Sequence, residues 1–340
     1  MTRCSLPTIS LLASEETSPA VLYGIYDVMS SVGVVYPEMV TGVPGEELFD
    51  VRIVARTRKP FRCFGAVIVE PHASIDEVEQ TDAVVVCDMY TPIDTPPSGR
   101  YPTEVEWLKQ MHEKNALLTS VCSGSAVLAE TGLLDGLEVA GHWAYRHMFR
   151  QHYPRVKMRE DMVLCRSGES QGIITAGGVT SWQVLTMYLV EHFCGLQHAI
   201  NTAKVHLLTS HENGQLPYSA MTQSELHNDA IIKDCQGWIA DNFTISNPVE
   251  KMTTRSGLQA RTFARRFRAA TGYFPLDYVQ ELRVESAKQL LETEQIGIDE
   301  IGGKVGYEDI ASFRRLFKRK SGLTPIAYRK KYKGIVASRM

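Results

Sequence analysis

Two stretches of this chain, residues 263–278 and 313–328, carry nearly the same pattern at a fixed offset of 50 residues. Each places Phe, Arg, Phe, a basic residue, Thr or Ser, Gly, Pro and Tyr in the same order. A repeated supersecondary unit constrains a fold strongly, because both copies must adopt the same local structure. A Gly after a basic amphipathic stretch, followed by Pro, is typical of a helix end. The pattern predicts two helix-turn-helix units, and therefore an all-α region, in the C-terminal third of the chain.

Each repeat divides into an apolar face and a basic face when it is drawn as a helix at about 100° per residue. In the first copy, Phe263 and Phe267 lie opposite Arg261, Arg265 and Arg268. The second copy divides in the same way, with Phe313, Leu316 and Phe317 on one side and Ala311, Arg315 and Lys318 on the other. A structural helical bundle with solvated arginines is the alternative, but it gives no reason for two aligned basic faces. We therefore predict two DNA-recognition helices.

Further helices are predicted around these two. Residues 248–257 begin with Pro and end with Gly, and residues 298–306 end with Gly, as expected for the first helix of each unit. Residues 276–294 form a connecting helix that would hold the two recognition helices in successive major grooves, about 10 bp apart. We expect Arg265 and Arg315 to contact base edges and Arg268 and Lys318 to contact phosphates. The full set of expected DNA contacts is Arg261, Thr262, Arg265, Arg268, Ala311, Ser312, Arg314, Arg315 and Lys318.

From about residue 225 to 331 the chain resembles the AraC/XylS family of transcriptional regulators, and residues 301–318 and 324–329 resemble the family signature most closely. The resemblance implies a sequence-specific DNA-binding regulator and, by family habit, an activator. Gly302 and Gly303 stand where the family has helix formers, at a cost of about 1 kcal/mol each relative to Ala, so this helix is expected to be soft. Gln259 stands where a Ser N-cap is usual, so the helix that follows is expected to be less well capped.

The charge is distributed unevenly along the chain. Residues 225–340 carry 20 Lys and Arg against 14 Asp and Glu, whereas residues 1–224 carry 16 against 25. The basic part suits double-stranded DNA, and the acidic part is not expected to touch it. The seven cysteines have no spacing typical of zinc or of a disulfide framework, so no metal and no cofactor are expected. Without a signal peptide or a long apolar run, the protein is interpreted as cytoplasmic, with no membrane partner.

The N-terminal two-thirds alternate short apolar runs with helical stretches. Strands are predicted at residues 9–13, 51–55, 83–87 and 117–121, and helices at residues 21–32, 103–114 and 125–131. Alternation of this kind predicts an α/β domain with a flavodoxin-like, doubly wound parallel sheet. Ligands of such sheets bind beyond the carboxyl ends of the strands.

Cys122 lies at such a strand end, before Ser123, Gly124 and a predicted helix, which is a nucleophile-elbow arrangement. The helix N-terminus is expected to favour its thiolate. With His142 twenty residues downstream, and with residues 132–136 and 174–183, the segment 9–210 resembles the PfpI-type branch of the class I glutamine amidotransferase-like superfamily. In that branch, a Cys at the elbow and a His at about this spacing form the catalytic pair. The resemblance therefore implies that Cys122 and His142 stand at the positions of this pair.

Three departures from that superfamily argue against catalysis. The strand that usually ends in a Gly-Gly turn runs here into Cys87, Asp88, Met89 and Tyr90; the expected Glu is displaced to Glu15 and Glu16; and no third residue is evident. Most of the rate enhancement depends on such groups. We therefore expect a catalytically degenerate domain whose pocket binds a small molecule through Cys122, Ser123, His142, Trp143 and Asp88. A retained Cys–His amidohydrolase or glyoxalase-like activity, a redox switch at Cys122, and an inert thiol over a vestigial pocket remain alternatives.

These observations predict three regions. Residues 1–210 would sense a ligand and dimerise, the polar, turn-rich residues 211–224 would be a linker, and residues 225–335 would bind DNA. The expected function is that of a transcriptional regulator that responds to a small metabolite. Its expected partners are double-stranded DNA, the small-molecule effector, a second copy of the chain bound through the N-terminal domain and, further, RNA polymerase.

Overall fold

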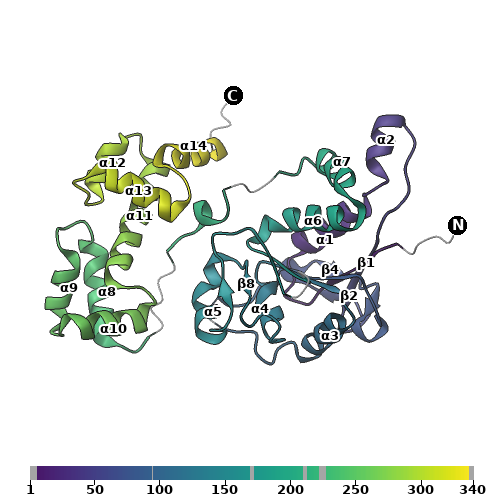
Figure 1. The fold of residues 1–340 in the computed structure, drawn as a ribbon, viewed down its shortest axis with the longest axis horizontal. Helices are drawn as coiled ribbons and strands as arrows, with labels where there is room; N and C mark the ends of the chain where they lie inside the picture. Colours follow the sequence, from purple (N-terminus) through teal and green to yellow (C-terminus); the bar gives the residue numbers. More distant parts are fainter. Residues whose placement is uncertain (1–5, 94, 169–171, 210–212, 222–226, 337–340) are drawn as a thin grey trace. The chain divides into compact units, whose positions relative to one another are not determined.

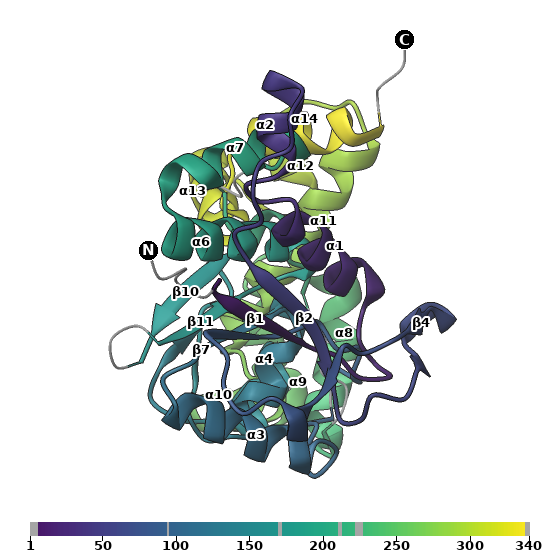
Figure 2. The same ribbon diagram turned by 90° about the vertical axis from the view of Figure 1, so that its right-hand side faces the viewer.

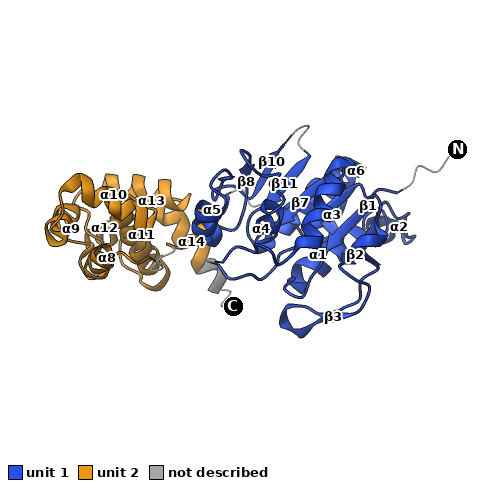
Figure 3. Ribbon diagram, turned by 90° about the horizontal axis from the view of Figure 1, so that it is seen from below, with its two compact units in different colours: residues 1–215 blue, residues 216–340 orange. Residues whose placement is uncertain are grey.

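The computed structural model describes residues 6–93, 95–168, 172–209, 213–221 and 227–336. It forms two compact units, residues 1–215 and 216–340, which are coloured separately in Figure 3. The predicted linker, residues 211–224, lies partly outside the described residues. Each unit is an independent body with its own hydrophobic core, and the two are described in turn.

The first unit is built on a seven-stranded sheet with the strand order β10-β11-β7-β6-β1-β2-β5. All neighbouring strands are parallel except the antiparallel pair β10–β11. The strands span Thr8–Leu12 (β1), Asp50–Ala55 (β2), Ala73–Ser74 (β5), Ala83–Val86 (β6), Leu117–Val121 (β7), Leu164–Ser167 (β10) and Ile173–Ala176 (β11). The predicted mostly parallel α/β sheet is thus confirmed, and β10 adds an antiparallel edge that the sequence analysis missed.

Helices cover both faces of this sheet, because successive strand residues face opposite sides. Ile9 and Leu11 point into the core beneath α1 and α6, whereas Leu12 points into the core beneath α3 and α4. Figures 1 and 2 show the two helical layers on either side of the strands. The helices span Pro19–Ser30 (α1), Val35–Thr41 (α2), Pro102–Glu113 (α3), Gly124–Ala129 (α4), Arg146–His152 (α5), Trp182–Cys194 (α6) and Leu196–His206 (α7).

Short elements complete this unit. Two small sheets pair β3 (Phe61–Arg62) with β4 (Ile68–Val69) and β8 (Glu138–Val139) with β9 (Lys157–Met158). Among the described residues, no single helix has the length and apolar composition needed to cross a membrane; only α1 and α2 taken together, bent by 53°, meet that test. In this structure α1 contributes Val21, Leu22 and Ile25 to the protein core.

The second unit consists of helices around two small cores. They span Ala230–Asn242 (α8), Pro248–Ser256 (α9), Ala260–Thr271 (α10), Pro275–Thr293 (α11), Ile298–Lys304 (α12), Ile310–Ser321 (α13) and Pro325–Val336 (α14). The pairs α9–α10 and α12–α13 are the two predicted helix-turn-helix units. The connecting helix α11 contacts members of both pairs, as predicted. It supplies Tyr278 to the first core and Val284 to the second.

The two repeats match in their contacts as well as in their residues. The rings of Phe267 and Tyr278 lie 5.2 Å apart at 81°, and those of Phe317 and Tyr328 lie 5.4 Å apart at 89°. At the end of each recognition helix, a hydroxyl donates to the carbonyl four residues earlier at 2.8 Å, from Thr271 in one copy and from Ser321 in the other. The glycine that follows has a φ of 78° or 74°, where a side chain would be strained. The repeated residues therefore fix where each helix ends and how it packs.

The N-terminal ends of the two recognition helices differ. Asp309 caps α13 by accepting hydrogen bonds from the backbone amides of Ala311 at 2.9 Å and Ser312 at 3.2 Å. The hydrogen bond from the Ser312 hydroxyl, together with these amide bonds, holds the pKa of Asp309 below its usual value. Gln259 makes no side-chain cap bond to α10, as its sequence position predicted. The first recognition helix therefore lacks one stabilising interaction that the second has.

The two glycines of α12 have different roles, so the expectation that both merely soften this helix was incomplete. A Cβ on the buried Gly302 would lie 2.8 Å from Cδ1 of Ile310 and 3.1 Å from Cδ1 of Phe313. Gly302 therefore allows α12 to approach α13 closely. A Cβ on Gly303 would meet nothing within 4 Å.

This difference predicts opposite outcomes for one substitution at neighbouring positions. Gly303→Ala should raise the free energy of unfolding by about 1 kcal/mol, because Ala is the better helix former. In Gly302→Ala the same gain should be offset by a steric cost of about 1–3 kcal/mol. Urea denaturation of the full-length variants measures both values. Equal stabilisation by the two changes would show that the close approach at Gly302 is incorrect.

Candidate DNA interface and elbow cysteine

The basic face of α10 is exposed, as the sequence predicted. Arg261, Arg265 and Arg268 are exposed on α10, Thr262 is half-buried, and Phe263 is buried on the opposite side. Among the described residues, Arg261 and Arg265 make no ion pair. Arg268 lies 4.5 Å from the centre of the Phe274 ring, which is within the range of a cation–π contact.

The basic face of α13 is also exposed, but its side chains have internal partners. Arg314 donates to Asp299 of α12 at 2.5 Å. Arg315 donates to the Ser312 hydroxyl at 2.9 Å. Ala311 and Lys318 are exposed beside them. The structure therefore gives each expected DNA-contact residue an exposed or half-buried place on a recognition helix, with more restraint on the second helix than on the first.

Arg266 shows that not every arginine of the repeat belongs to this surface. It forms a two-pronged ion pair with Asp229, at 2.9 Å through Nε and 2.8 Å through Nη2. Asp229 is also the N-cap of α8 and accepts a hydrogen bond from Ile232. The pair thus joins α8 to α10, so Arg266 stabilises the fold of this unit.

The strand β7 ends at the predicted elbow. Cys122 has a φ of 54°, in the left-handed region that non-glycine residues rarely adopt. Its backbone amide donates to the carbonyl of Ala176 at 2.7 Å. A Cβ on Gly124 would lie 2.4 Å from the carbonyl oxygen of Val86, so only glycine lets α4 begin this close to β6. These constraints hold Cys122 at the carboxyl edge of the sheet.

Asp88 occupies the space in which an amidotransferase would stabilise negative charge. Its Oδ1 accepts hydrogen bonds from the backbone amide of Ser123 at 3.3 Å and from the Ser123 hydroxyl at 2.5 Å. The amide of the residue after the nucleophile normally contributes to an oxyanion hole. Here a buried carboxylate already takes that amide. An anionic intermediate at the same place would be repelled by Asp88.

The expectation of a thiolate at Cys122 is corrected by its surroundings. Burial raises the pKa of the Cys122 thiol well above its usual value, and the charge of Asp88 and a hydrogen bond to it act in the same direction. Backbone amides of Ser123 and Gly178 favour the thiolate but are outweighed. The helix that follows has six residues, so its dipole is small. Burial and the neighbouring carboxylate of Asp88 therefore both disfavour the thiolate of Cys122.

His142 is placed beside this cluster without the geometry of a general base. Burial lowers the pKa of His142, which is neutral at pH 7. Its Nδ1 accepts a hydrogen bond from the amide of Ala144 at 3.2 Å, which assigns the ring proton to Nε2. The ring packs against Trp143 at 5.0 Å. Asp88 is near enough to affect His142 electrostatically, so the predicted residues do form one cluster.

Glu16, which follows β1, forms an ion pair away from the elbow cluster. Glu16 pairs with Arg100 at 2.8 Å and accepts from the Ser14 hydroxyl at 3.1 Å. The carboxylate of Glu16 is therefore neutralised by an arginine. Within the described residues, no group of three or more His, Cys, Asp or Glu side chains is arranged to hold a metal ion.

A cavity of about 440 Å³ lies at the carboxyl ends of β1 and β2. Glu104 on its wall is buried and accepts two hydrogen bonds from Arg56, at 3.0 and 2.8 Å. The buried hydroxyl of Tyr101 has no hydrogen-bond partner among the described atoms. The sequence gives no sign of this cavity, because its lining comes from three segments that are distant in the chain.

Gln215 was also not predicted from the sequence, because it lies in the polar stretch assigned to the linker. It is buried, and its Nε2 donates to the carbonyls of Gly141 at 3.0 Å and Met162 at 2.7 Å. Gly141 directly precedes His142. A Cβ on Gly177 would lie 2.0 Å from the Gln215 Nε2, so Gln215 fits tightly beside the elbow.

Both units match known protein families. Residues 20–192 match the DJ-1/PfpI family, and residues 252–331 match a helix-turn-helix domain. The HTH-type transcriptional regulator CdhR of Pseudomonas aeruginosa is 21% identical over 306 residues, covering 88% of this chain and 87% of that protein. The HTH-type transcriptional regulator GlxA of Rhizobium meliloti is 24% identical over 259 residues, covering 75% and 77%.

Two solved structures are also similar. An AraC family transcriptional regulator from Pseudomonas putida has a TM-score of 0.48 and 16% identity, covering 59% of this chain and 99% of that one. The DNA-binding domain of AdpA, solved in complex with a target DNA, has a TM-score of 0.31 and 33% identity, covering 32% and 96%.

The fold and the two family matches define a protein with a glutamine amidotransferase-like α/β domain followed by tandem helix-turn-helix units. The chain belongs to the DJ-1/PfpI family in its N-terminal unit, and it is an AraC-family transcriptional regulator that binds DNA through its C-terminal unit. Both resemblances inferred from the sequence are thereby confirmed.

The Asp88 contact predicts a measurable change in the chemistry of Cys122. Asp88→Asn should lower the thiol pKa, because it removes a neighbouring negative charge. The pH dependence of iodoacetamide labelling, followed at the Cys122 peptide, should shift to lower pH. Asp82→Asn, at the opposite end of the same strand, is the matched control. An unchanged labelling profile in Asp88→Asn would mean that burial alone suppresses the thiolate.

Proposed function

We propose that this regulator binds two adjacent half-sites through α10 and α13, and that its N-terminal domain controls this binding in response to a small molecule. The observation that carries the DNA part is the repeated packing of Phe267 on Tyr278 and of Phe317 on Tyr328, which fixes each basic helix against the helix that follows it, while α11 contacts members of both helix pairs. By family habit, the bound regulator activates transcription through RNA polymerase.

The contacts of each arginine support different roles on DNA. Arg265 and Arg315 occupy matching positions and are proposed to contact base edges, with Arg261, Thr262, Ala311 and Ser312 near the starts of the helices. Arg268 and Lys318 are proposed to contact phosphates. Arg314 is also proposed to contact phosphate, because its ion pair with Asp299 already engages part of its guanidinium. Base contacts specify sequence, whereas phosphate contacts supply affinity on any duplex.

Footprinting of full-length variants tests this assignment. Wild-type protein should protect two patches of one operator, about 10 bp apart on one side of the duplex. Arg265→Ala should weaken protection of one patch and Arg315→Ala that of the other, each at a cost of roughly 1–3 kcal/mol on the operator and much less on random DNA. Arg255→Ala, which removes an exposed arginine of α9 paired with Asp234, is the control. Equal losses on both DNAs would assign Arg265 and Arg315 to phosphates.

We infer that the N-terminal domain binds its effector without turning it over. Three features support this: the carboxylate of Asp88 on the Ser123 amide, the raised pKa of Cys122, and the His142 Nδ1 that already accepts a hydrogen bond. An acyl-transfer enzyme would instead need a free amide to bind the oxyanion, an ionised thiol and a histidine nitrogen that is free to accept a proton. Turnover of small amides or dicarbonyls by the wild-type protein would contradict this inference.

Two places in the domain are candidates for the effector. The elbow residues Cys122, Ser123 and Asp88 are buried, so a ligand reaches them only if the site opens, whereas His142 and Trp143 are half-exposed. The cavity beside β1 and β2 is already open, and Tyr101 lines it together with Ser14 and Glu16. Its volume falls in the range of about 300–1,000 Å³ that is usual for small-molecule sites.

A thermal-shift screen of metabolites against the full-length protein should find a ligand that stabilises it by about 2.7 kcal/mol at 100 times its Kd. Tyr101→Phe and Trp143→Phe then separate the two places. If the effector occupies the cavity, Tyr101→Phe should reduce the shift and Trp143→Phe should leave it intact; the reverse result places the effector at the elbow. A screen without any stabilising compound would contradict ligand sensing.

We also propose that the regulator forms a homodimer through its N-terminal domain. The helices α2 and α7, which contact each other, expose apolar side chains that a monomer would leave in water. The exposed apolar residues are Met39, Val40, Leu196 and Ile200.

A further inference from the structure

We infer that Arg283 is a positioning residue that locks the two helix-turn-helix units together and thereby sets the half-site spacing that the protein accepts. The lock lies entirely within the DNA-binding unit and joins the turn between α8 and α9 to the turn between α12 and α13. The inference rests on the proposed function, because spacing matters only if both recognition helices bind. It goes beyond that function by assigning the spacing to particular residues.

The connecting helix needs a contact of this kind at its middle. The length of α11 sets the distance between the two cores, but bending of the helix would still change the angle between α10 and α13. Leu282 packs against the first core and Val284 belongs to the second, so α11 passes from one core to the other at Arg283. A contact beside the helix at this point would resist such bending.

The side chain of Arg283 holds the turn that follows α8. Its Nε donates to the carbonyl of Phe243 at 2.8 Å, and its Nη2 donates to the carbonyl of Ile245 at 3.0 Å. Phe243 is the C-cap of α8, and carbonyl groups at a helix C-terminus carry a partial negative charge that attracts a guanidinium. Phe243 also packs against the first core. Arg283 therefore fixes this turn to the middle of α11.

The same guanidinium contacts the second helix-turn-helix unit. Its Cζ lies 5.0 Å from the centre of the Tyr307 ring, which is within the range of a cation–π contact. The ring of Tyr307 lies 5.6 Å from that of Phe313, and Phe313 is buried in the second core. One side chain of α11 thus connects the turn before α9 with the turn before α13.

The two turns also approach each other directly. Gly306, which precedes Tyr307, has a φ of 87°, and a Cβ there would lie 2.8 Å from the Cα of Thr244 and closer still to its carbonyl oxygen. Glycine permits this approach because it has no Cβ. Thr244 lies between the two residues whose carbonyls accept from Arg283. The turns therefore pack backbone against backbone.

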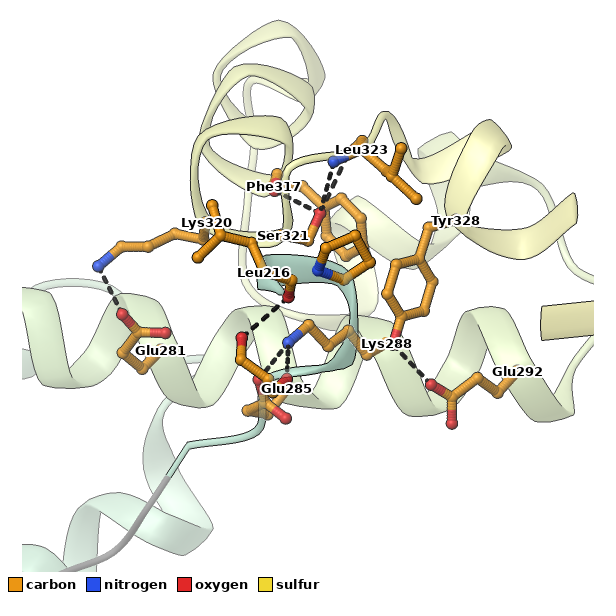
Figure 4. A network of polar contacts seen from close by, with 12 residues as sticks. Leu216, Glu281, Glu285, Lys288, Glu292, Phe317, Lys320, Ser321, Leu323 and Tyr328 are labelled. Carbon is orange, nitrogen blue, oxygen red and sulfur yellow. Dashed lines mark hydrogen bonds and ion pairs between the residues drawn. The ribbon is translucent and has the colours of Figure 1, made fainter. Parts of the chain in front are cut away.

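Polar contacts hold the second recognition helix against the same connecting helix. Nζ of Lys320 on α13 donates to Glu281 on α11 at 2.6 Å, and the hydroxyl of Tyr328 on α14 donates to Glu292 on α11 at 2.7 Å (Figure 4). The side chains of Lys320 and Glu281 are only 22% and 16% exposed, so salt screens this ion pair less than a surface pair. The lock at Arg283 therefore fixes the orientation of α13 as well as that of the turn before it.

The lock predicts a narrow tolerance for the distance between the two half-sites. One base pair inserted between them moves the second half-site by about 3.4 Å and turns it by about 34° around the duplex. Two rigidly held helices cannot follow this change, whereas two helices joined by a bending connection can follow part of it. Arg283 is half-buried and needs no contact with DNA to have this effect.

The spacing preference of full-length variants tests the lock. The probe is an operator selected from random duplexes by the wild-type protein, compared with versions that have one base pair inserted or deleted between the two protected patches. The wild type should bind the altered operators roughly tenfold more weakly, as for one lost base contact, and this ratio should fall below about threefold in Arg283→Met. This change keeps the side-chain length and removes both donor bonds.

Arg329→Met is the matched control for this change. Arg329 is also a half-buried arginine that donates to a backbone carbonyl, that of Ile296 at 2.8 Å, but both residues belong to the second helix-turn-helix unit and its flanks. The control should keep the wild-type ratio. An unchanged ratio in Arg283→Met, an equal fall in both variants, or equal binding of all three operators by the wild type would overturn the inference.

Gly306→Ala tests the same lock without changing any charge. The added Cβ should push the turn away from Thr244, so the ratio should fall in this variant too. Gly257→Ala is its control, since Gly257 has a φ of 64° but a Cβ there would meet nothing within 4 Å. Equal ratios in these two variants would contradict the lock even if Arg283→Met failed to fold.

The wild-type footprint separates this inference from the proposed function. A footprint with a single protected patch would contradict the proposed function and the lock with it. Two protected patches, together with unchanged ratios in Arg283→Met and Gly306→Ala, would contradict the lock alone.

Discussion

The DNA-binding unit depends on one interaction made twice, the edge-on packing of a tyrosine against the second phenylalanine of a recognition helix. Phe267 with Tyr278 and Phe317 with Tyr328 are buried pairs of almost the same geometry. In each pair the tyrosine belongs to the helix that follows the turn, so the ring contact sets the angle between the two helices. Because Tyr278 and Leu291 of α11 belong to different cores, a rigid helix sets the spacing of the two helix-turn-helix units, about 20 Å over the thirteen steps from Tyr278 to Leu291. These buried contacts therefore position the exposed arginines.

In the N-terminal unit, the elbow of an enzyme-like scaffold lies beside a buried carboxylate. The strained backbone of Cys122 and the close approach at Gly124 retain the elbow. Burial and the carboxylate of Asp88, however, raise the pKa of the thiol, and Asp88 also accepts a hydrogen bond from the Ser123 amide. Charge and burial act in the same direction here, so loss of one of them alone would not restore an activated thiolate. The result is a polar, closed cluster whose hydrogen bonds respond to small displacements of its neighbours.

The sequence predicted what depends on local pattern. The matching residues of the two repeats, the four central strands and the weak cap at Gln259 all follow from periodicity, turn residues and caps. What it missed depends on residues that are distant in the chain. Asp88 meets Ser123 only because β6 and β7 are neighbours, and Gln215 lies in a stretch whose polar composition predicts a linker. Helix propensity gave an incomplete view of Gly302, since it does not consider the side chain of Phe313. The helix dipole likewise predicted a thiolate at Cys122, because the sequence alone does not show that this side chain is buried.

The two recognition helices are chemically unequal, and this gives the protein a polarity on DNA. The guanidinium groups of Arg261 and Arg265 have no ion pair among the described residues, whereas Arg314 of α13 is held by Asp299. A phosphate or base that binds Arg314 must replace an existing bond, so the net gain in free energy there is smaller than at α10. We therefore expect α10 to bind DNA more tightly than α13, because binding at Arg314 must first break the ion pair with Asp299. We expect such a protein to lie along a promoter in one direction, which the unequal ion pairs of its two recognition helices would set.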